Sequence, residues 1–462
     1  MSPTNRVVIV GAGISGLALA YRLRQADPGC EITILEKTSR PGGTVWTEDT
    51  SGFRVEFGAN GFLDHKSSTL QLCRDLGLED RLIAAEEAAS RNRYLFLGDR
   101  LKPLPGSLPA LLRTDLLSWR GKLNLFAERF RRPRRSGGDE SVDAFARRRA
   151  GPEVAEIFAD ALVTGIHAGD PQLLSMSAAF PRIASLEREF GSVIKGLGRS
   201  SRRDAGGAPG RMWSFGEGLR LLIDSLGRVL SSSLQFGASA ERLAIQTADA
   251  GRSRWTVYGA DRLWEADAVV LACPAYQQAA VLASVDQALA DEVGAVAYNR
   301  VAVVAVGYGR NQVPINIDGF GYISPQRTRR DVLGVQWCSS IFPSRAPDGS
   351  VLLRAMCGGW HRPEVVGWDD DRLLHAVRSD LAAAMRITAE PCFHRIIRWD
   401  RAIPQYLLGH GTRVARIDAK AARHPGLFLA GNAYHGVALN DCTEQAAVLA
   451  QRVQRYLADR GR

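Results

Sequence analysis

The sequence predicts an α/β fold with additional helices, built around one parallel-sheet domain that is discontinuous along the chain. Three observations predict it. A β-branched run near the N-terminus leads into closely spaced glycines and a helical pattern, a second apolar run lies near residue 270, and a third lies near residue 428. Long stretches separate these runs, and a chain of 462 residues is long enough for two or three lobes.

The first stretch, residues 1–88, has the pattern of a nucleotide-binding βαβ unit. Val7–Val10 is expected to be a central strand, and it runs directly into a GxGxxG sequence. In that sequence Gly11 allows a tight turn, Gly13 lets backbone approach a pyrophosphate, and Gly16 lets helix and strand pack closely. The start of the following helix offers free N–H groups and a partial positive charge to phosphate groups.

The end of this stretch indicates which dinucleotide is bound. A second predicted strand ends in Glu36, whose carboxylate can accept both ribose hydroxyls and would repel a 2′-phosphate, which disfavours NADP. Arg40-Pro41-Gly42-Gly43 follows at once. This Arg-x-Gly-Gly resembles the second FAD motif of the amine-oxidase-like flavoproteins, in which backbone wraps the cofactor. We therefore expect FAD.

Two later stretches are expected to return to the same domain. In residues 211–293, Asp267–Pro274 resembles the segment with which this superfamily brings its chain back to the cofactor sheet. In residues 406–462, Leu427–Ala430 is a predicted buried strand that precedes a helix. Asp441 and Glu444 resemble a capping box, which places the helix start at Asp441. The resemblance implies that the helix N-terminus points at the flavin and stabilises its reduced form.

The inserted stretch 89–210 is expected to be helical and to face a membrane. Residues 91–135 hold twelve Lys or Arg and three Asp or Glu, which is nearly the whole net charge of +10. The same residues are rich in Leu, Trp and Phe, a mixture suited to an anionic lipid surface. A solvated basic face over an ordinary core helix is the alternative, and no nucleic-acid-binding motif accompanies the charge. The Ser-, Gly- and Arg-rich segment 199–211 is expected to be a surface loop.

Local patterns along the whole chain resemble the protoporphyrinogen oxidases of this superfamily. They are Phe57–Phe62, Asn92–Tyr94, Thr164–Asp170, Gly319–Gly321, Ile403–Tyr406 with Gly409-His410, and Gly431–Cys442. The resemblance implies three parts: a Rossmann-like FAD-binding domain (1–88, 211–293 and 406–462), an inserted helical membrane-binding and substrate-channel domain (89–210), and an inserted mixed-sheet substrate domain (294–405).

The resemblance also implies roles for individual residues. Arg93 matches the arginine that holds a propionate, Phe320 the aromatic that packs on a pyrrole ring, and Gly165 the glycine beside the macrocycle. Ile323 and Leu333 are the expected wall neighbours. Asn60 is expected near flavin and substrate and is the candidate for a catalytic role. The expected cofactor contacts are Gly11, Gly13, Ser15, Gly16, Glu36, Arg40, Gly42, Gly43, Gly58, Ala59, Asn60, Gly61, Gly431, Val437, Ala438 and Leu439.

The activity that the resemblance implies is the six-electron oxidation of protoporphyrinogen IX to protoporphyrin IX, with FAD taking the hydrides and dioxygen reoxidising it. Coproporphyrinogen III oxidation stays open as an alternative, as do amine oxidation, carotene desaturation and a flavin-binding relative without turnover. His167 and His435 depart from the family pattern, and His167 bears on the substrate's identity. The sequence shows no acid/base dyad, triad or metal cluster.

The cysteine pattern and the N-terminus favour a cytoplasmic protein that touches a membrane from one side. The seven cysteines form no CxxC pair, and the first predicted strand begins too close to Met1 for a secretory signal. No apolar run approaches the roughly 20 residues that a spanning helix needs. Ferrochelatase and a second copy of the chain are the protein partners that remain open.

Overall fold

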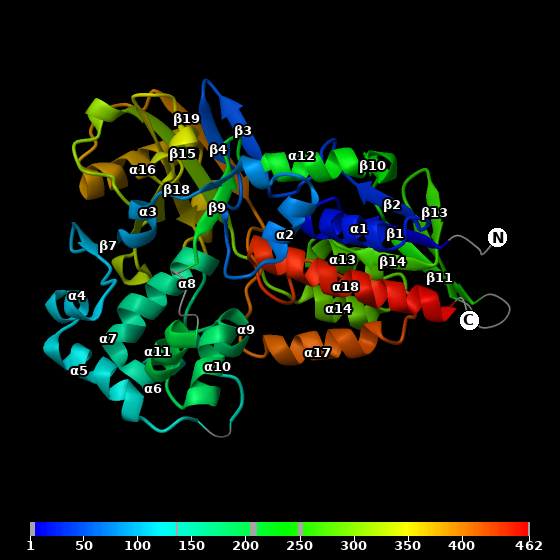
Figure 1. Cartoon of the computed structure of the whole chain (residues 1–462), viewed down its shortest axis with the longest axis horizontal. Coiled ribbons are helices and arrows are strands. Elements are labelled where there is room, and N and C mark those ends of the chain that lie inside the picture. Colours follow the sequence, from blue (N-terminus) through cyan, green and yellow to red (C-terminus); the bar gives the residue numbers. More distant parts are fainter. Residues whose placement is uncertain (1–4, 135–136, 204–209, 248–252, 461–462) are drawn as a thin grey trace.

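A five-stranded parallel sheet with the order β10-β2-β1-β14-β20 lies at the centre of one half of the molecule (Figure 1). The computed structural model describes residues 5–134, 137–203, 210–247 and 253–460. The strands are β1 (Arg6–Val10), β2 (Glu31–Glu36), β10 (Leu234–Phe236), β14 (Ala268–Leu271) and β20 (Leu427–Leu429). They come from the start, the middle and the end of the chain, as the three apolar runs predict.

Both faces of this sheet are covered, as expected of parallel strands with continuous apolar sequences. Val7 and Ile9 face one core, whereas Val8 faces the other. The first core is completed by α1 (Ile14–Ala26), α2 (Ser68–Asp75), α12 (Arg220–Val229) and α18 (Leu439–Arg460). The second is completed by β11 (Arg242–Thr247), β12 (Ser253–Tyr258), β13 (Leu263–Ala266), α13 (Ala275–Leu282), α14 (Gln287–Gly294) and α17 (His410–Ala421).

A seven-stranded mixed sheet forms the second half of the molecule, with the order β19-β15-β18-β17-β16-β7-β8. The strands are β7 (Arg93–Leu97), β8 (Arg100–Pro103), β15 (Val301–Gly309), β16 (Gly321–Ile323), β17 (Val332–Trp337), β18 (Ser350–Gly358) and β19 (Phe393–Trp399). Helix α16 (Asp370–Met385) packs on one face. Because β7 and β8 belong to this sheet, the stretch 89–210 is not helical throughout: β7 pairs with β16 of the 294–405 stretch, and β8 pairs with β7 at the edge of the sheet.

The remainder of that stretch forms a helical lobe, at the lower left of Figure 1. Its elements are α4 (Leu108–Arg113), α5 (Trp119–Ala127), η2 (Glu128–Phe130), α6 (Val142–Ala150), α7 (Pro152–Val154), a single π-helical turn η3 (Ala155–Ala159), α8 (Asp160–His167), α9 (Met176–Ala179), α10 (Pro181–Phe190) and α11 (Val193–Arg203). The expected loop 199–211 therefore begins as helix, and residues 204–209 lie outside the described part of the chain.

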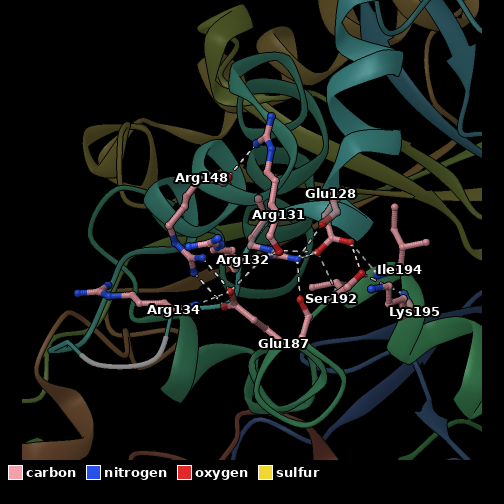
Figure 2. Close-up of polar contacts among 12 residues, drawn as sticks. Glu128, Arg131, Arg132, Arg134, Arg148, Glu187, Ser192, Ile194 and Lys195 are labelled. Atoms are coloured by element: carbon pink, nitrogen blue, oxygen red, sulfur yellow. Dashed lines mark hydrogen bonds and ion pairs between the residues drawn. The ribbon is translucent and has the colours of Figure 1, made fainter.

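A buried ion pair ties these helices together (Figure 2). The Glu128 carboxylate accepts hydrogen bonds from Arg149 Nε at 2.8 Å and Ser192 Oγ at 2.5 Å. It also accepts the backbone N–H groups of Val193 at 3.0 Å and Ile194 at 3.2 Å, so it caps the start of α11. The Arg149 guanidinium donates to backbone carbonyls of η2, of the chain after it and of the α10–α11 turn. One carboxylate thus joins η2, α6 and α11.

The remaining elements of the described chain are short. They are β3 (Thr47–Thr50), β4 (Phe53–Glu56), β5 (Phe62–Leu63), η1 (Glu79–Arg81), β6 (Leu82–Ala84), α3 (Glu87–Arg91), β9 (Met212–Phe215), η4 (Ser231–Ser233), η5 (Arg310–Gln312), η6 (Gln326–Thr328), α15 (Cys338–Ile341), η7 (Pro343–Arg345) and η8 (Pro363–Gly367). Among the described residues, no helix combines the length and the apolar character needed to cross a bilayer.

Candidate active site

The glycine turn after β1 has the geometry that a pyrophosphate requires. Gly11 has a φ of +107°, and a Cβ there would lie 2.9 Å from the backbone nitrogen of Cys273. A Cβ on Gly16 would lie 2.0 Å from the Gly11 carbonyl oxygen. The space beside Gly13 holds no atom within 4 Å of a Cβ position, and the first turn of α1 has neither an acidic residue nor a side-chain cap. The turn is therefore open to an anion.

Hydrogen bonds fix the Glu36 side chain at the end of β2. Its carboxylate is buried and accepts the Ala12 N–H at 3.1 Å on one oxygen. The other oxygen accepts the Thr38 N–H at 2.9 Å and the Thr38 hydroxyl at 2.8 Å. Since a carboxylate has about four acceptor positions and three are used here, Glu36 can still receive a hydroxyl group of a ribose.

The predicted second motif lies against the first. The Gly42 N–H donates to the Ala12 carbonyl at 2.7 Å, and Gly13 and Gly42 form an isolated parallel bridge. The Arg40 guanidinium stacks on the Trp46 ring, 4.2 Å from its centroid, and burial lowers the pKa of Arg40. Arg40, Gly42 and Gly43 therefore extend the wall that begins at the glycine turn.

Asn60 is a buried polar side chain that lacks a partner. It is 5% exposed, and neither its amide oxygen nor its amide nitrogen has a hydrogen bond within the described residues. It lies in the tight segment Gly58–Gly61, where a Cβ on Gly58 would lie 2.4 Å from the Thr44 carbonyl oxygen. Because buried amides are normally satisfied, Asn60 indicates a polar ligand at this position.

The C-terminal helix starts two residues earlier than the sequence suggested. Helix α18 begins at Leu439, and Asp441 lies in its first turn. The Asp441 carboxylate reaches back to the Ala438 N–H at 3.0 Å, so Asp441 caps Ala438 instead of opening the helix. Glu444 pairs with Lys66 at 2.6 Å. The Ala438 N–H is thus occupied, while Gly431, with a φ of +113°, and Val437 flank the entry to the helix.

Arg93 and Phe320, which are both expected to bind the substrate, are in contact. The Arg93 guanidinium lies over the Phe320 ring at 4.9 Å from the centroid, and Arg93 in β7 pairs with Gly321 in β16. No carboxylate pairs with Arg93 in the part of the chain that the structure describes. Partial burial lowers its pKa, yet a guanidinium stays charged at neutral pH. Arg93 is therefore a cation available to an anion.

The other expected wall residues lie along the same sheet. A Cβ on Gly165, in α8, would lie 2.7 Å from Ile323 Cδ1, so helix and strand meet closely at this glycine. Ile323 packs with Leu95 and neighbouring apolar residues of the helical lobe. Leu333 is buried and packs with Ala168 at the end of α8. The structure thus brings Gly165 and Ile323 together, with Leu333 deeper in the core.

His167 is buried between aromatic rings. It is 1% exposed, and its ring lies 5.5 Å from Phe180 and 6.1 Å from Tyr406. Its ring nitrogens make no well-aligned hydrogen bond within the described residues, although the backbone of Ala179 is close. Burial lowers the pKa of His167 to about 4, so the ring is neutral at pH 7. His167 therefore occupies an aromatic packing position.

Sequence reasoning missed a group of buried charges beside the Gly58–Gly61 segment. Arg345 is fully buried and pairs with Glu56 at 2.9 Å. Arg354, in β18, is 5% exposed and donates to the Gly58 carbonyl and to Gln336 Oε1. The available signal was a single Arg within an apolar run, Val351–Cys357. Which residues lie beside Arg354 depends on strand pairing, and the sequence does not show that pairing.

Known proteins place this geometry in a family. Residues 14–454 match the family described as flavin containing amine oxidoreductase. The chain belongs to this family. Among its relatives, the chloroplastic protoporphyrinogen oxidase of Nicotiana tabacum is 33% identical, covering 98% of this chain and 86% of its own length. The coproporphyrinogen III oxidase of Staphylococcus aureus is 30% identical, covering 97% and 99%.

A solved structure supports the same assignment of the fold. The crystal structure of a candidate protoporphyrinogen oxidase from Exiguobacterium sp. 255-15 is 26% identical and superposes with a TM-score of 0.85, covering 98% of this chain and all of that one. The match spans both halves of the molecule. The arrangement of the parallel sheet, the mixed sheet and the helices is thus that of a flavin-containing amine oxidoreductase.

As a member of the flavin-containing amine oxidoreductases, the chain is an FAD-dependent oxidoreductase. Its residues fit the cofactor. The open turn at Gly13 suits the pyrophosphate, Glu36 suits a ribose, and the unpartnered Asn60 amide suits a polar edge of the ring system. These three features come from segments that the fold brings to one edge of the parallel sheet and its neighbouring loops.

Proposed function

We propose that this chain oxidises protoporphyrinogen IX to protoporphyrin IX. The contact between Arg93 and Phe320 carries the proposal: a free cation is stacked on an aromatic ring at the rim of an apolar sheet face. The substrate is an apolar macrocycle with carboxylate arms, and such a site offers one group for each part. The relative from Nicotiana tabacum has the same activity by name.

The chain's own residues bind and orient the substrate. Arg93 holds one propionate in a bidentate pair, and Phe320 packs against a pyrrole ring. Gly165 lies beside the macrocycle, where a side chain would also collide with Ile323 Cδ1, and the surrounding apolar side chains exclude water. Bound FAD supplies the two-electron acceptor in each of three rounds, with dioxygen taking the electrons onward to hydrogen peroxide. Asn60 offers a polar contact to the ring system, and the described residues include no three-ligand metal cluster.

Coproporphyrinogen III is the second candidate substrate. The relative from Staphylococcus aureus favours it, because the match covers nearly all of both chains and that protein is named for this substrate. The two porphyrinogens differ in the number of carboxylate arms, four against two, so the number of cations at the rim decides between them.

Turnover with both substrates tests the proposal. Purified holoenzyme is mixed aerobically with protoporphyrinogen IX or coproporphyrinogen III, and porphyrin fluorescence is followed against an enzyme-free autoxidation control. A higher kcat/KM for protoporphyrinogen IX supports the main proposal, and a higher value for coproporphyrinogen III supports the second. If neither rate exceeds the control although FAD is bound, both proposals are wrong, and amines and carotenes are the next substrates.

We further propose that the helical lobe rests on an anionic membrane surface. Four large apolar side chains of α4, α5 and η2 are exposed: Leu112, Trp119, Leu123 and Phe130, the last at 79%. Cations lie among them, and Arg120 and Arg129 stack on the rings of Trp119 and Phe130, each at 5.4 Å. Aromatic rings sink into the headgroup region while guanidinium groups meet lipid phosphates.

Liposome flotation tests this contact. The protein is expected to float with vesicles of anionic lipid and to be released at high salt, because screening weakens the attraction. The double variant Trp119→Ser/Phe130→Ser is expected to stay in solution. Leu263→Ser is the matched control, because Leu263 is 59% exposed but lies in β13, away from the lobe (Figure 1). Equal flotation of the double variant and the control would contradict the proposal.

A further inference from the structure

The register of the mixed sheet aligns a row of residues from Arg93 to Arg354. Arg93 in β7 pairs with Gly321 in β16, Gly321 pairs with Gln336 in β17, and Gln336 pairs with Arg354 in β18. Directly paired residues point to the same face of a sheet. Arg354 and Gln336 therefore share the face of Arg93, and Gly321 places no side chain between them.

Arg354 is a buried cation without a carboxylate of its own. It is 5% exposed, donates to Gln336 Oε1 at 3.2 Å and to the Gly58 carbonyl, and its Nε has no partner within the described residues. The nearby Glu56 is already engaged: it pairs with Arg345 at 2.9 Å and accepts the Leu219 N–H at 2.8 Å. Two guanidinium groups and one carboxylate leave the cluster with at least one net positive charge, because burial raises the pKa of Glu56 while a guanidinium stays charged.

Burying an unpaired charge costs folding free energy, so such a charge is normally retained where it has a role. Here the Arg354 guanidinium donates a hydrogen bond to Gly58, at the start of the segment Gly58–Gly61, which carries the unpartnered Asn60 amide. A hydride brings two electrons and one proton to a bound flavin, so the reduced ring system carries one more negative charge than the oxidised one. A fixed positive charge in a site of low dielectric stabilises that form.

We propose that Arg354 is a positioning residue for the cofactor: it fixes the Gly58–Gly61 segment and supplies the buried positive charge that favours reduced over oxidised FAD. The inference goes beyond the proposed substrate, since it rests on FAD binding alone. A failure of porphyrinogen turnover leaves it standing, and its own failure leaves the substrate proposal standing.

The reduction potential of bound FAD tests this role. In Arg354→Met, which keeps much of the side-chain length but no charge, the ratio of affinities for reduced over oxidised FAD is expected to fall at least tenfold. For a two-electron couple this is a potential lower by about 30 mV. Arg354→Lys keeps the charge but loses the planar guanidinium group. Its ratio of affinities for reduced over oxidised FAD is expected to stay within threefold of the wild-type ratio, while oxidised FAD binds more weakly. Dye-equilibrated spectroelectrochemistry and absorbance titration give the two readouts.

Arg300→Met is the matched control. Arg300 flanks β15 of the same sheet, but its side chain is partly exposed and pairs with Asp400. Its removal is expected to leave the potential unchanged. If Arg354→Met does not fold, Arg354→Gln, which keeps hydrogen-bond donors, takes its place.

Two outcomes would overturn the inference. One is a neutral variant that binds FAD with a wild-type potential. The other is a neutral variant that changes only the KM for a porphyrinogen, because Arg354 would then be a contact for substrate.

Discussion

Arg93 combines a free charge with an aromatic platform, which makes it the most informative single residue for substrate binding. Replacing it with alanine removes the propionate contact and leaves Phe320 in place. We expect the KM for the porphyrinogen to rise at least tenfold, because a charge-assisted bidentate pair contributes about 1.5–3 kcal/mol. Steady-state kinetics measure the change.

Arg91→Ala is the control for this variant. Arg91 is two residues away, is exposed and pairs with Glu87. Its KM and its flavin absorbance should match the wild type. An Arg93→Ala enzyme with an unaltered KM would remove Arg93 from the substrate site.

The buried His167 ring makes the fold sensitive to acid. Its folded pKa is about 4, below the unfolded value of about 6.5, so the unfolded chain binds a proton first as the pH falls. Stability is therefore lost between about pH 6.5 and pH 4, by about 3 kcal/mol in all. His167→Phe keeps the ring between Phe180 and Tyr406 and should abolish this part of the acid sensitivity.

Denaturant unfolding at pH 7 and pH 5 measures this effect. His394→Phe is the comparison, since His394 is exposed in β19. If His167→Phe and His394→Phe lose the same stability on acidification, the protonation of His167 does not contribute.

At the level of elements, the Glu128–Arg149 pair joins three helices of the lobe, η2, α6 and α11. Burial by itself raises the pKa of Glu128, but hydrogen bonds from Ser192, Arg149 and two backbone amides outweigh burial and hold the pKa below its usual value. Glu128 therefore stabilises the lobe above about pH 4.3 and loses this effect as the pH falls through its folded pKa.

Glu128→Gln should destabilise the lobe at neutral pH by about 1–3 kcal/mol, because the buried Arg149 loses its nearer carboxylate partner and keeps Glu187 at 3.4 Å. Hydrogen exchange of α6 and α11 measures the loss. Arg147→Gln is a control in the same helix, since that pair with Asp143 is on the surface. Protection of α6 and α11 that is equal in both variants would contradict the structural role of Glu128.

The sequence was most informative where an element carries its own local pattern. The β1 and β14 strands and the glycine turn follow from β-branched runs and from glycine spacing, and the structure has them at those residues. The pairing of β7 with β16 could not be predicted, because it joins residues that are more than 200 positions apart and neither strand shows its partner. The start of α18 was misplaced because an acid can cap either as the first residue or from the first turn.

The site divides in the same way. The glycines of the cofactor turn could be predicted from the sequence, because the backbone at Gly11 and Gly16 leaves no space for a side chain. Arg354 was missed, since its importance comes from the neighbours that the sheet register gives it. A strand residue with a charge in an apolar run is visible in a sequence, but the partner that explains the charge is not.

At the scale of the molecule, FAD should stabilise the whole chain. Its expected contacts lie on two stretches, 1–88 and 406–462, whose strands belong to one sheet, so binding links the start of the chain to its end. Adding FAD at 100 times its Kd to apoprotein should stabilise the fold by about 2.7 kcal/mol and raise the midpoint of thermal unfolding. Calorimetry with and without FAD measures the shift. An unchanged midpoint would mean that these stretches do not bind it.

The order of strands in the parallel sheet also has a consequence for synthesis of the chain. Strand β1 pairs with β2 on one side, which emerges soon after it, and with β14 on the other, which begins only at Ala268. At about 5–20 residues per second, the nascent chain exposes one edge of β1 for roughly 13–50 s. An unpaired β-branched edge is a template for association with other chains. We therefore expect the ribosome-bound intermediate to depend on chaperones until β14 has been synthesised.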